Sequence, residues 1–268
     1  MPPSFDLWPG FTVSTTELSQ LTAIISTANQ PQSVNRLVRS LRRSYPEIHI
    51  MVADASGQSA KAQRDVDSIR LSVGAGRSAG YNALLARVRT PYFLLINDCC
   101  ELANDSSVVD LLSLVSSDKL DIAAGDLIAC QRRLWFFVSR RPAPGHGLME
   151  IAGDQLTLTH GSRGPGEGFH WCDFVAPFFV ARTSKVRALG GWDQQLEQDE
   201  QEEFFVRAHR QGIRVGLVPE VTVWQWPETL TQEPSRDLKS LAVAKMGLAR
   251  MTDFEGRVVK APRRAMAA

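Results

Sequence analysis

GAGRSAGYNALLARVRTPYFLLINDCCE, residues 74–101, is the stretch that predicts the centre of the fold. Its three glycines permit a tight turn and a close approach of the backbone to a ligand. A short helix is expected over residues 81–89, and Pro91 ends it, because the residue before a proline avoids the helical region. The apolar run 92–96 is typical of a strand covered on both faces. The strand ends at Asp98, where open α/β sheets bind their ligands.

The rest of the chain alternates strand and helix patterns around this stretch, which predicts an α/β protein with a single mixed, mostly parallel sheet flanked by helices. Strands are expected at 21–27, 48–53, 69–73, 121–125, 174–182, 215–218 and 221–226, and helices around 34–41 and at 106–117, 183–189 and 201–211. Residues 126–170 are less regular and indicate strands broken by loops. We expect a lead-in (1–20), one domain (21–235, with halves 21–125 and 126–235) and a basic C-terminal helix and tail (236–268).

Composition excludes several classes of protein. The 268 residues are 44% hydrophobic and 22% charged with a formal net charge of +1, as in a soluble globular protein with no electrostatic preference for nucleic acid. No apolar run reaches the length of about 18 residues that a membrane span needs, although peripheral membrane contact stays open. The four cysteines follow no zinc or disulfide pattern, and the N-terminus has no secretory signal, so we expect free thiols and a cytoplasmic location.

Four segments in order resemble family 2-like inverting glycosyltransferases of the GT-A fold. They are IISTANQP (24–31), VADAS (52–56), the run from Gly76 to Glu101, and the acceptor half from Cys172 to Trp224. The last looks closest to the β-1,4-N-acetylgalactosaminyltransferase branch, through FFVARTSKVRALGGWD (178–193) and EEFF (202–205). The resemblance implies inverting transfer of a hexosyl or N-acetylhexosaminyl group from a UDP-sugar to a hydroxyl of a carbohydrate or lipid-linked saccharide, in polysaccharide biosynthesis.

The N-terminal half then holds the nucleotide sugar. The resemblance assigns Asp54 to the uracil, whose N–H a carboxylate accepts well. Thr27 and Asn29 line the same pocket. Arg77 and Asn82 lie near a helix start that suits a diphosphate. Helix capping and turn chemistry are the alternative roles of these residues.

The metal-binding segment departs from the family pattern. Asn97-Asp98-Cys99 stands where a DxD motif holds Mn²⁺ or Mg²⁺, so Asp98 is the one carboxylate left. A thiol is a poor ligand for these hard cations, and Gln225 takes the place of the family's late histidine ligand. We therefore expect reduced metal dependence, with arginines or lysines offsetting the diphosphate charge.

Acceptor activation needs a carboxylate base, and the dense acidic group before Phe204 offers one. Gln201 replaces the usual aspartate, so Glu203 and Glu202 are the candidate catalytic residues. Acids at a helix N-terminus also favour the helix dipole, which is the structural alternative. Three further residues are candidates for contact with the acceptor or the donor sugar: Asp173, Trp192 and Asp193. Capping and core packing are their alternative roles.

Two other functions compete with sugar transfer. A GT-A scaffold that lost its metal and base would act as a binding module. The glycines at 74, 76 and 80 also loosely match the fingerprint of NAD(P)-dependent oxidoreductases. That fingerprint normally follows the first strand of its domain, whereas this run follows the third predicted strand.

Overall fold

The computed structural model describes residues 18–28, 30–57, 65–103, 106–133, 137–196, 200–227 and 236–262. Its strands are β1 (Leu21–Thr27), β2 (His49–Asp54), β3 (Asp67–Arg70), β4 (Tyr92–Ile96), β5 (Cys100–Leu102), β6 (Ile122–Arg133), β7 (Phe137–Ala143), β8 (His146–Ala152), β9 (Gln155–His160), β10 (His170–Cys172), β11 (Phe174–Val175), β12 (Phe178–Arg182), β13 (Val215–Gln225), β14 (Arg250–Thr252) and β15 (Val258–Lys260). The helices are α2 (Pro31–Ser44), α3 (Arg77–Leu85), α4 (Val108–Ser116), α5 (Thr183–Ala188), α6 (Glu200–Arg210) and α7 (Arg236–Lys245).

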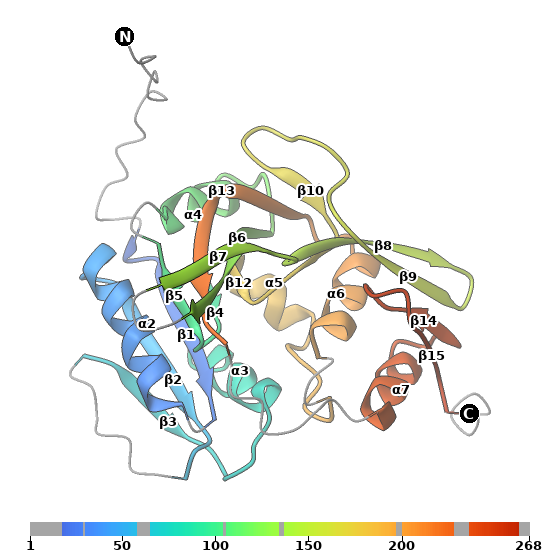
Figure 1. Cartoon of the computed structure of the whole chain (residues 1–268), viewed down its shortest axis with the longest axis horizontal. Coiled ribbons are helices and arrows are strands. Elements are labelled where there is room, and N and C mark those ends of the chain that lie inside the picture. The colour runs from blue at the N-terminus through green and yellow to red at the C-terminus, as the bar shows by residue number, and fades with distance from the viewer. Residues whose placement is uncertain are drawn as a thin grey trace.

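The central sheet confirms the α/β expectation and has helices on both sides (Figure 1). Its main path runs β10-β13-β6-β12-β4-β1-β2-β3. β3, β2, β1 and β4 are mutually parallel, as expected for the nucleotide half. β12 then runs antiparallel to both β4 and β6, so the second half of the sheet is more mixed than the sequence predicted. The parallel strands β1, β2 and β4 have their carboxyl ends at one shared edge, which is where open α/β sheets bind their ligands.

A second, five-stranded sheet was not expected from the sequence. It runs β11-β8-β9-β14-β15 and is built largely from the irregular region 126–170. The C-terminal segment adds to it, because β14 pairs in parallel with β9 after α7. In Figure 1 this sheet and α7 gather at one end of the molecule, beside α6. No helix among the described residues is long and apolar enough to cross a membrane.

The central strands are buried on both faces, which explains their continuous apolar sequences. Ile24 and Phe93 face one side, where they belong to the same cluster as Phe204 of α6. Their neighbours Ile25 and Leu94 face the other side and join the cluster that contains apolar residues of α2 and α4. Alternation along each strand therefore divides the core into two layers.

The glycine-rich stretch differs from its predicted form. The helix spans Arg77–Leu85 rather than 81–89, so Gly80 lies inside it. A Cβ atom on Gly80 would stand 2.0 Å from Ser26 Oγ, which shows that this glycine lets α3 approach β1 closely. The run therefore packs a helix on the sheet after β3, and it is not the first turn of a dinucleotide-binding domain. The third strand is also displaced, to Asp67–Arg70.

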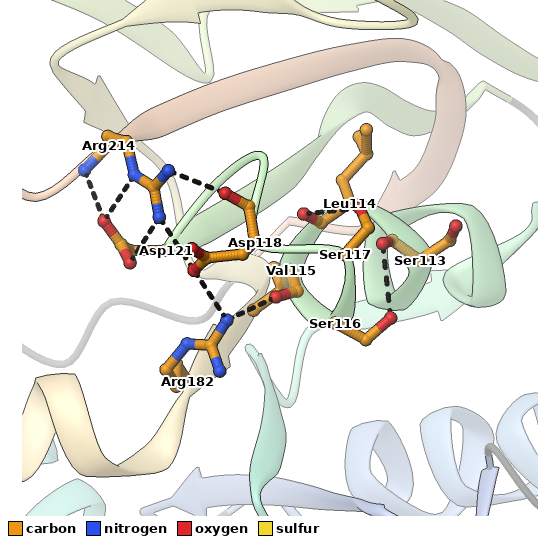
Figure 2. A network of polar contacts seen from close by, with 9 residues as sticks. All are labelled: Ser113, Leu114, Val115, Ser116, Ser117, Asp118, Asp121, Arg182 and Arg214. Atoms are coloured by element: carbon orange, nitrogen blue, oxygen red, sulfur yellow. Dashed lines mark hydrogen bonds and ion pairs between the residues drawn. The ribbon is translucent and has the colours of Figure 1, made fainter.

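A polar network ties the starts of β6 and β13 to α4 (Figure 2). Asp121 is 1% exposed and accepts hydrogen bonds from the Arg214 backbone N–H (3.0 Å) and Nε (3.1 Å). Arg214 and Arg182 both donate to Asp118 Oδ1, at 3.0 and 3.1 Å. Burial alone would raise the pKa of Asp121, but the Arg214 hydrogen bonds and charge outweigh it and hold that pKa below its usual value.

This network predicts a pH-dependent contribution to stability. Because the Asp121 pKa is lowered on folding, its contribution is full above the unfolded-state value of about 3.9 and is lost as the pH falls through the folded-state pKa. We expect Asp121→Asn to lower the free energy of unfolding at neutral pH by about 2 kcal/mol and to flatten the acid limb. Urea denaturation between neutral and acid pH measures both effects.

Asp118→Asn is the matched control, because Asp118 bonds the same arginine from an exposed position. It should cost less than about 1 kcal/mol. Equal losses in the two variants would contradict the role given to the buried carboxylate.

Candidate functional site

Three adjacent strand ends meet at one edge of the central sheet. Thr27 and Asp54 are register partners at the ends of β1 and β2. Thr27 Oγ1 donates a hydrogen bond to Asp98 Oδ2 at 2.6 Å, and both side chains are buried. Asp98 follows β4, so this bond joins the ends of β1 and β4. The structure thus brings together three of the residues predicted for the nucleotide sugar.

Local hydrogen bonds orient Asp54 and Asn97 at these strand ends. Asp54 is half-buried, and its Oδ1 accepts the backbone N–H of Ser56 at 2.8 Å. No other hydrogen bond to the Asp54 side chain occurs within the described ranges, which leaves acceptor capacity at the edge. Asn97 is held by Tyr81, whose hydroxyl donates to Asn97 Oδ1 at 2.9 Å. Arg77 is the first residue of α3, and Asn29 lies outside the described residues.

The predicted metal position holds an unusual pair of side chains. Cys99 is fully buried, and Gln225 Nε2 lies 4.0 Å from its sulfur. The backbone N–H of Trp226 donates a hydrogen bond to the Cys99 carbonyl at 3.0 Å, which ties the end of β13 to the segment after β4. Among the described residues, no group of three or more His, Cys, Asp or Glu side chains could hold a metal ion.

Asn82 binds the protein's own backbone. Its Nδ2 donates to the Trp192 carbonyl at 2.7 Å, and its Oδ1 accepts the Trp192 N–H at 2.9 Å. Gly191 has φ +70°, and a Cβ there would stand 2.2 Å from Asn82 Oδ1. The Asn82 amide therefore holds the turn before Trp192, a positioning role that the sequence did not suggest.

Trp192 is an internal residue at 2% exposure. Its ring stacks on Phe204 at 4.9 Å with an interplanar angle of 14°, and Tyr81 packs against it at 5.1 Å. Its neighbour Asp193 bonds Lys245 of α7 at 2.6 Å. Burial acts to raise the pKa of Asp193, but the bond to Lys245 outweighs it and lowers that pKa.

The acidic start of α6 contains an ion pair. Both Glu203 oxygens are bonded by Arg207, through Nε at 2.6 Å and Nη2 at 2.7 Å. Arg207 also donates to the carbonyls of Leu189 and Gly191, so the pair anchors the segment between α5 and α6. Glu202 is half-buried in the same turn. The sequence missed the role of Arg207, although the i,i+4 spacing from Glu203 is the signal for such a pair.

Asp173 is the centre of a second polar cluster. It is 6% exposed and accepts hydrogen bonds from the Met149 N–H at 3.0 Å and from Arg163 at 2.5 Å. His209 of α6 lies at 3.2 Å from its other oxygen. Asp173 therefore links α6 to the second sheet.

Seven residues have buried side-chain polar atoms with no hydrogen-bond partner among the described residues, and Gln201 and Trp192 of the predicted acceptor half are two of them. Gln201 is 7% exposed, and within the described parts of the chain neither its oxygen nor its nitrogen has a hydrogen-bond partner. The same holds for the indole N–H of Trp192. Unsatisfied buried groups cost free energy, so their presence favours a site that a hydroxyl-rich ligand completes. The sequence identified Gln201 only as a departure from the family aspartate.

Comparison with known proteins identifies the family and the fold. The family model described as "Glycosyl transferase family 2" matches residues 22–187. Beta-1,4 N-acetylgalactosaminyltransferase 2 of Mus musculus is 26% identical over 231 residues, which are 84% of this chain and 42% of that protein. Beta-1,4 N-acetylgalactosaminyltransferase 1 of Homo sapiens is 26% identical over 236 residues, 83% of this chain and 42% of that one. The chain thus spans less than half the length of these curated relatives.

Two solved structures share the fold at low sequence identity. GalNAc-T7 with UDP, GalNAc and Mn²⁺ superposes with a TM-score of 0.64 at 14% identity, covering 83% of this chain and 47% of that one. S. aureus TarS 1-349 in complex with UDP-GlcNAc gives a TM-score of 0.58 at 12% identity, covering 84% and 66%. The fold is GT-A, and, since the family match runs from β1 through nearly all of α5, the chain belongs to glycosyl transferase family 2.

Proposed function

We propose that this protein transfers a sugar from a UDP-sugar to a hydroxyl of a carbohydrate or lipid-linked saccharide, with inversion at the anomeric carbon. The observation that carries the proposal is the meeting of Thr27, Asp54 and Asp98 at three adjacent strand ends. The names of the curated relatives support an N-acetylhexosamine as the donor sugar.

The donor half follows from this geometry. Asp54 accepts the uracil N–H with its remaining acceptor capacity. The diphosphate lies at the N-terminus of α3, where Arg77 and the first backbone N–H groups favour negative charge. The sugar extends toward Gln201 and Trp192, whose buried polar groups then gain hydrogen-bond partners.

Divalent-metal chemistry does not fit the residues present. Mn²⁺ and Mg²⁺ prefer oxygen ligands, whereas the family positions hold the Cys99 thiol and the Gln225 amide, which contact each other. Asn97 Oδ1 is already bonded by Tyr81, and Asp98 is bonded by Thr27. The proposed reaction therefore does not use a divalent metal, and cationic side chains offset the charge of the leaving diphosphate.

Transfer itself requires a base at the acceptor hydroxyl. A carboxylate takes the hydroxyl proton while the oxygen forms its bond to the anomeric carbon and UDP leaves from the opposite face. We place this role on the pair Glu202 and Glu203. Since Arg207 holds both oxygens of Glu203, Glu203 can act only if that pair opens, whereas Glu202 is half-buried one residue earlier.

The nucleotide assignment is tested by Asp54→Ala. We expect UDP affinity to fall by about 1–3 kcal/mol, because the uracil N–H loses its charged partner. Isothermal titration calorimetry measures this change. Asp67→Ala removes an exposed carboxylate from the adjacent strand and should leave affinity unchanged. Unchanged affinity in folded Asp54→Ala would remove Asp54 from the site.

Metal dependence is tested by the same titration with EDTA or Mn²⁺. Because the donor set lacks hard ligands, we expect UDP affinity to differ by less than about threefold between the two conditions. Cys99→Asp combined with Gln225→His restores oxygen and imidazole donors and should make binding Mn²⁺-dependent. A tight Mn²⁺ site in the wild-type protein without nucleotide would contradict the assignment.

The base is tested by glutamine substitutions, which remove the charge at nearly constant shape. We expect Glu202→Gln to lower turnover by about 100-fold. Glu203→Gln should lower the melting temperature, because it breaks the bidentate pair with Arg207. Initial rates of UDP release, measured well below the melting temperature, separate the two effects.

Other outcomes of this experiment reassign the role. Full activity in Glu202→Gln with loss in folded Glu203→Gln would make Glu203 the base. Full activity in both would exclude the pair and make Asp173 the next residue to test. Absence of transfer in a wild type that binds UDP would favour a binding module.

A further inference from the structure

The hairpin of β6 and β7 is strongly basic. It carries Arg132, Arg133, Arg140 and Arg141, and the sequence has no Asp or Glu between Asp126 and Glu150. Arg132, Arg140 and Arg141 are exposed.

The register of the hairpin distributes these charges over both faces. Arg140 is the partner of Cys130, and Arg132 is the partner of Val138, so Arg132 and Arg140 share one face. Arg141 lies on the other face, together with Phe137. Cations on both faces suit a hairpin that meets a negatively charged surface with its end rather than with one side.

Tryptophans hold the arginines of the first face in place. The Arg140 guanidinium lies 4.6 Å from the centre of the Trp224 ring, and that of Arg132 lies 6.0 Å from the Trp226 ring. Trp224 belongs to β13, which pairs with β6, and Trp226 directly follows the end of β13. Such cation–π contacts restrict the side chains but leave their N–H groups directed to other partners.

β7 begins with an exposed apolar residue. Phe137 begins β7 at 61% exposure, the second largest value among the exposed large hydrophobic residues described. It lies about 10 Å from Arg140, at about 3.4 Å per strand residue. This matches the depth of about 5–10 Å to which interfacial segments enter a bilayer, with cations left at the headgroups. Residues 134–136, which join the two strands in the sequence, lie outside the described residues.

We propose that the β6–β7 hairpin docks the protein on a membrane surface that contains anionic lipids. Phe137 enters the interface and Arg132, Arg140 and Arg141 bind the headgroups. An exposed aromatic residue at the start of β7, in the same hairpin as the exposed arginines, favours a bilayer over a soluble polyanion, because only a bilayer removes the ring from water. The proposal concerns location and does not depend on the sugar-transfer reaction.

Vesicle co-sedimentation of the full chain tests it. We expect binding to vesicles of phosphatidylcholine mixed with phosphatidylserine, little binding to phosphatidylcholine alone, and loss at high salt. Arg140→Gln with Arg141→Gln should lower the partition coefficient by about 25-fold, from about fivefold per arginine. Phe137→Ser should lower it by roughly tenfold without changing net charge.

The matched control is Arg87→Gln with Arg89→Gln. It removes the same charge from two exposed arginines that precede β4. β4 and β6 point the same way, because β12 is antiparallel to both, so this control lies at the sheet edge opposite the hairpin. It should bind vesicles as the wild type does. Melting temperatures of all variants establish that each is folded.

Three results would overturn the proposal. They are equal binding to neutral and anionic vesicles, an equal loss in the control variant, and full binding by Phe137→Ser. Failure of the wild type to sediment with vesicles, combined with heparin retention that Arg140→Gln with Arg141→Gln abolishes, would assign the surface to a soluble acidic polymer instead.

Discussion

The buried hydrogen bond from Thr27 Oγ1 to Asp98 Oδ2, at 2.6 Å, is the interaction on which the candidate site depends. A buried carboxylate is tolerated only when it is bonded, and this bond joins the ends of β1 and β4 in the middle of the sheet. The parallel pairing of β1 with β2 then fixes Asp54 beside Thr27. The positions of these side chains are therefore a consequence of strand register. Gly80 lets helix α3 pack closely against β1 beside them.

The second half of the site is held by contacts that the family pattern does not reveal. The Asn82 amide bonds both backbone groups of Trp192, and Arg207 bonds the carbonyls of Leu189 and Gly191 while holding Glu203. Trp192 then stacks on Phe204 of α6. Several polar residues at the site thus position its backbone, whereas Gln201 and the Trp192 indole N–H have no partner of their own within the described chain.

The departures from the metal-binding pattern form one coherent change. Cys99 and Gln225 are 126 residues apart, yet their side chains meet at 4.0 Å. A thiol and an amide are poor ligands for hard divalent cations. In the proposed reaction, cationic side chains and the N-terminus of α3 therefore offset the charge of the leaving diphosphate.

The sequence alone determined the central fold. Strands that are buried on both faces, such as β1 and β4, have continuous apolar sequences, and helices α2 and α6 have apolar residues at the helical spacing that places them on the core-facing side. It also located the strand-end residues Thr27, Asp54 and Asp98, since polar residues that directly follow buried strands share an edge. It did not reveal the second sheet, the start of α3 at Arg77, or the engagement of Asn82 and Glu203. Those features were decided by tertiary structure, because short strands carry little periodic signal and a polar side chain's partner is chosen by contacts between segments distant in sequence.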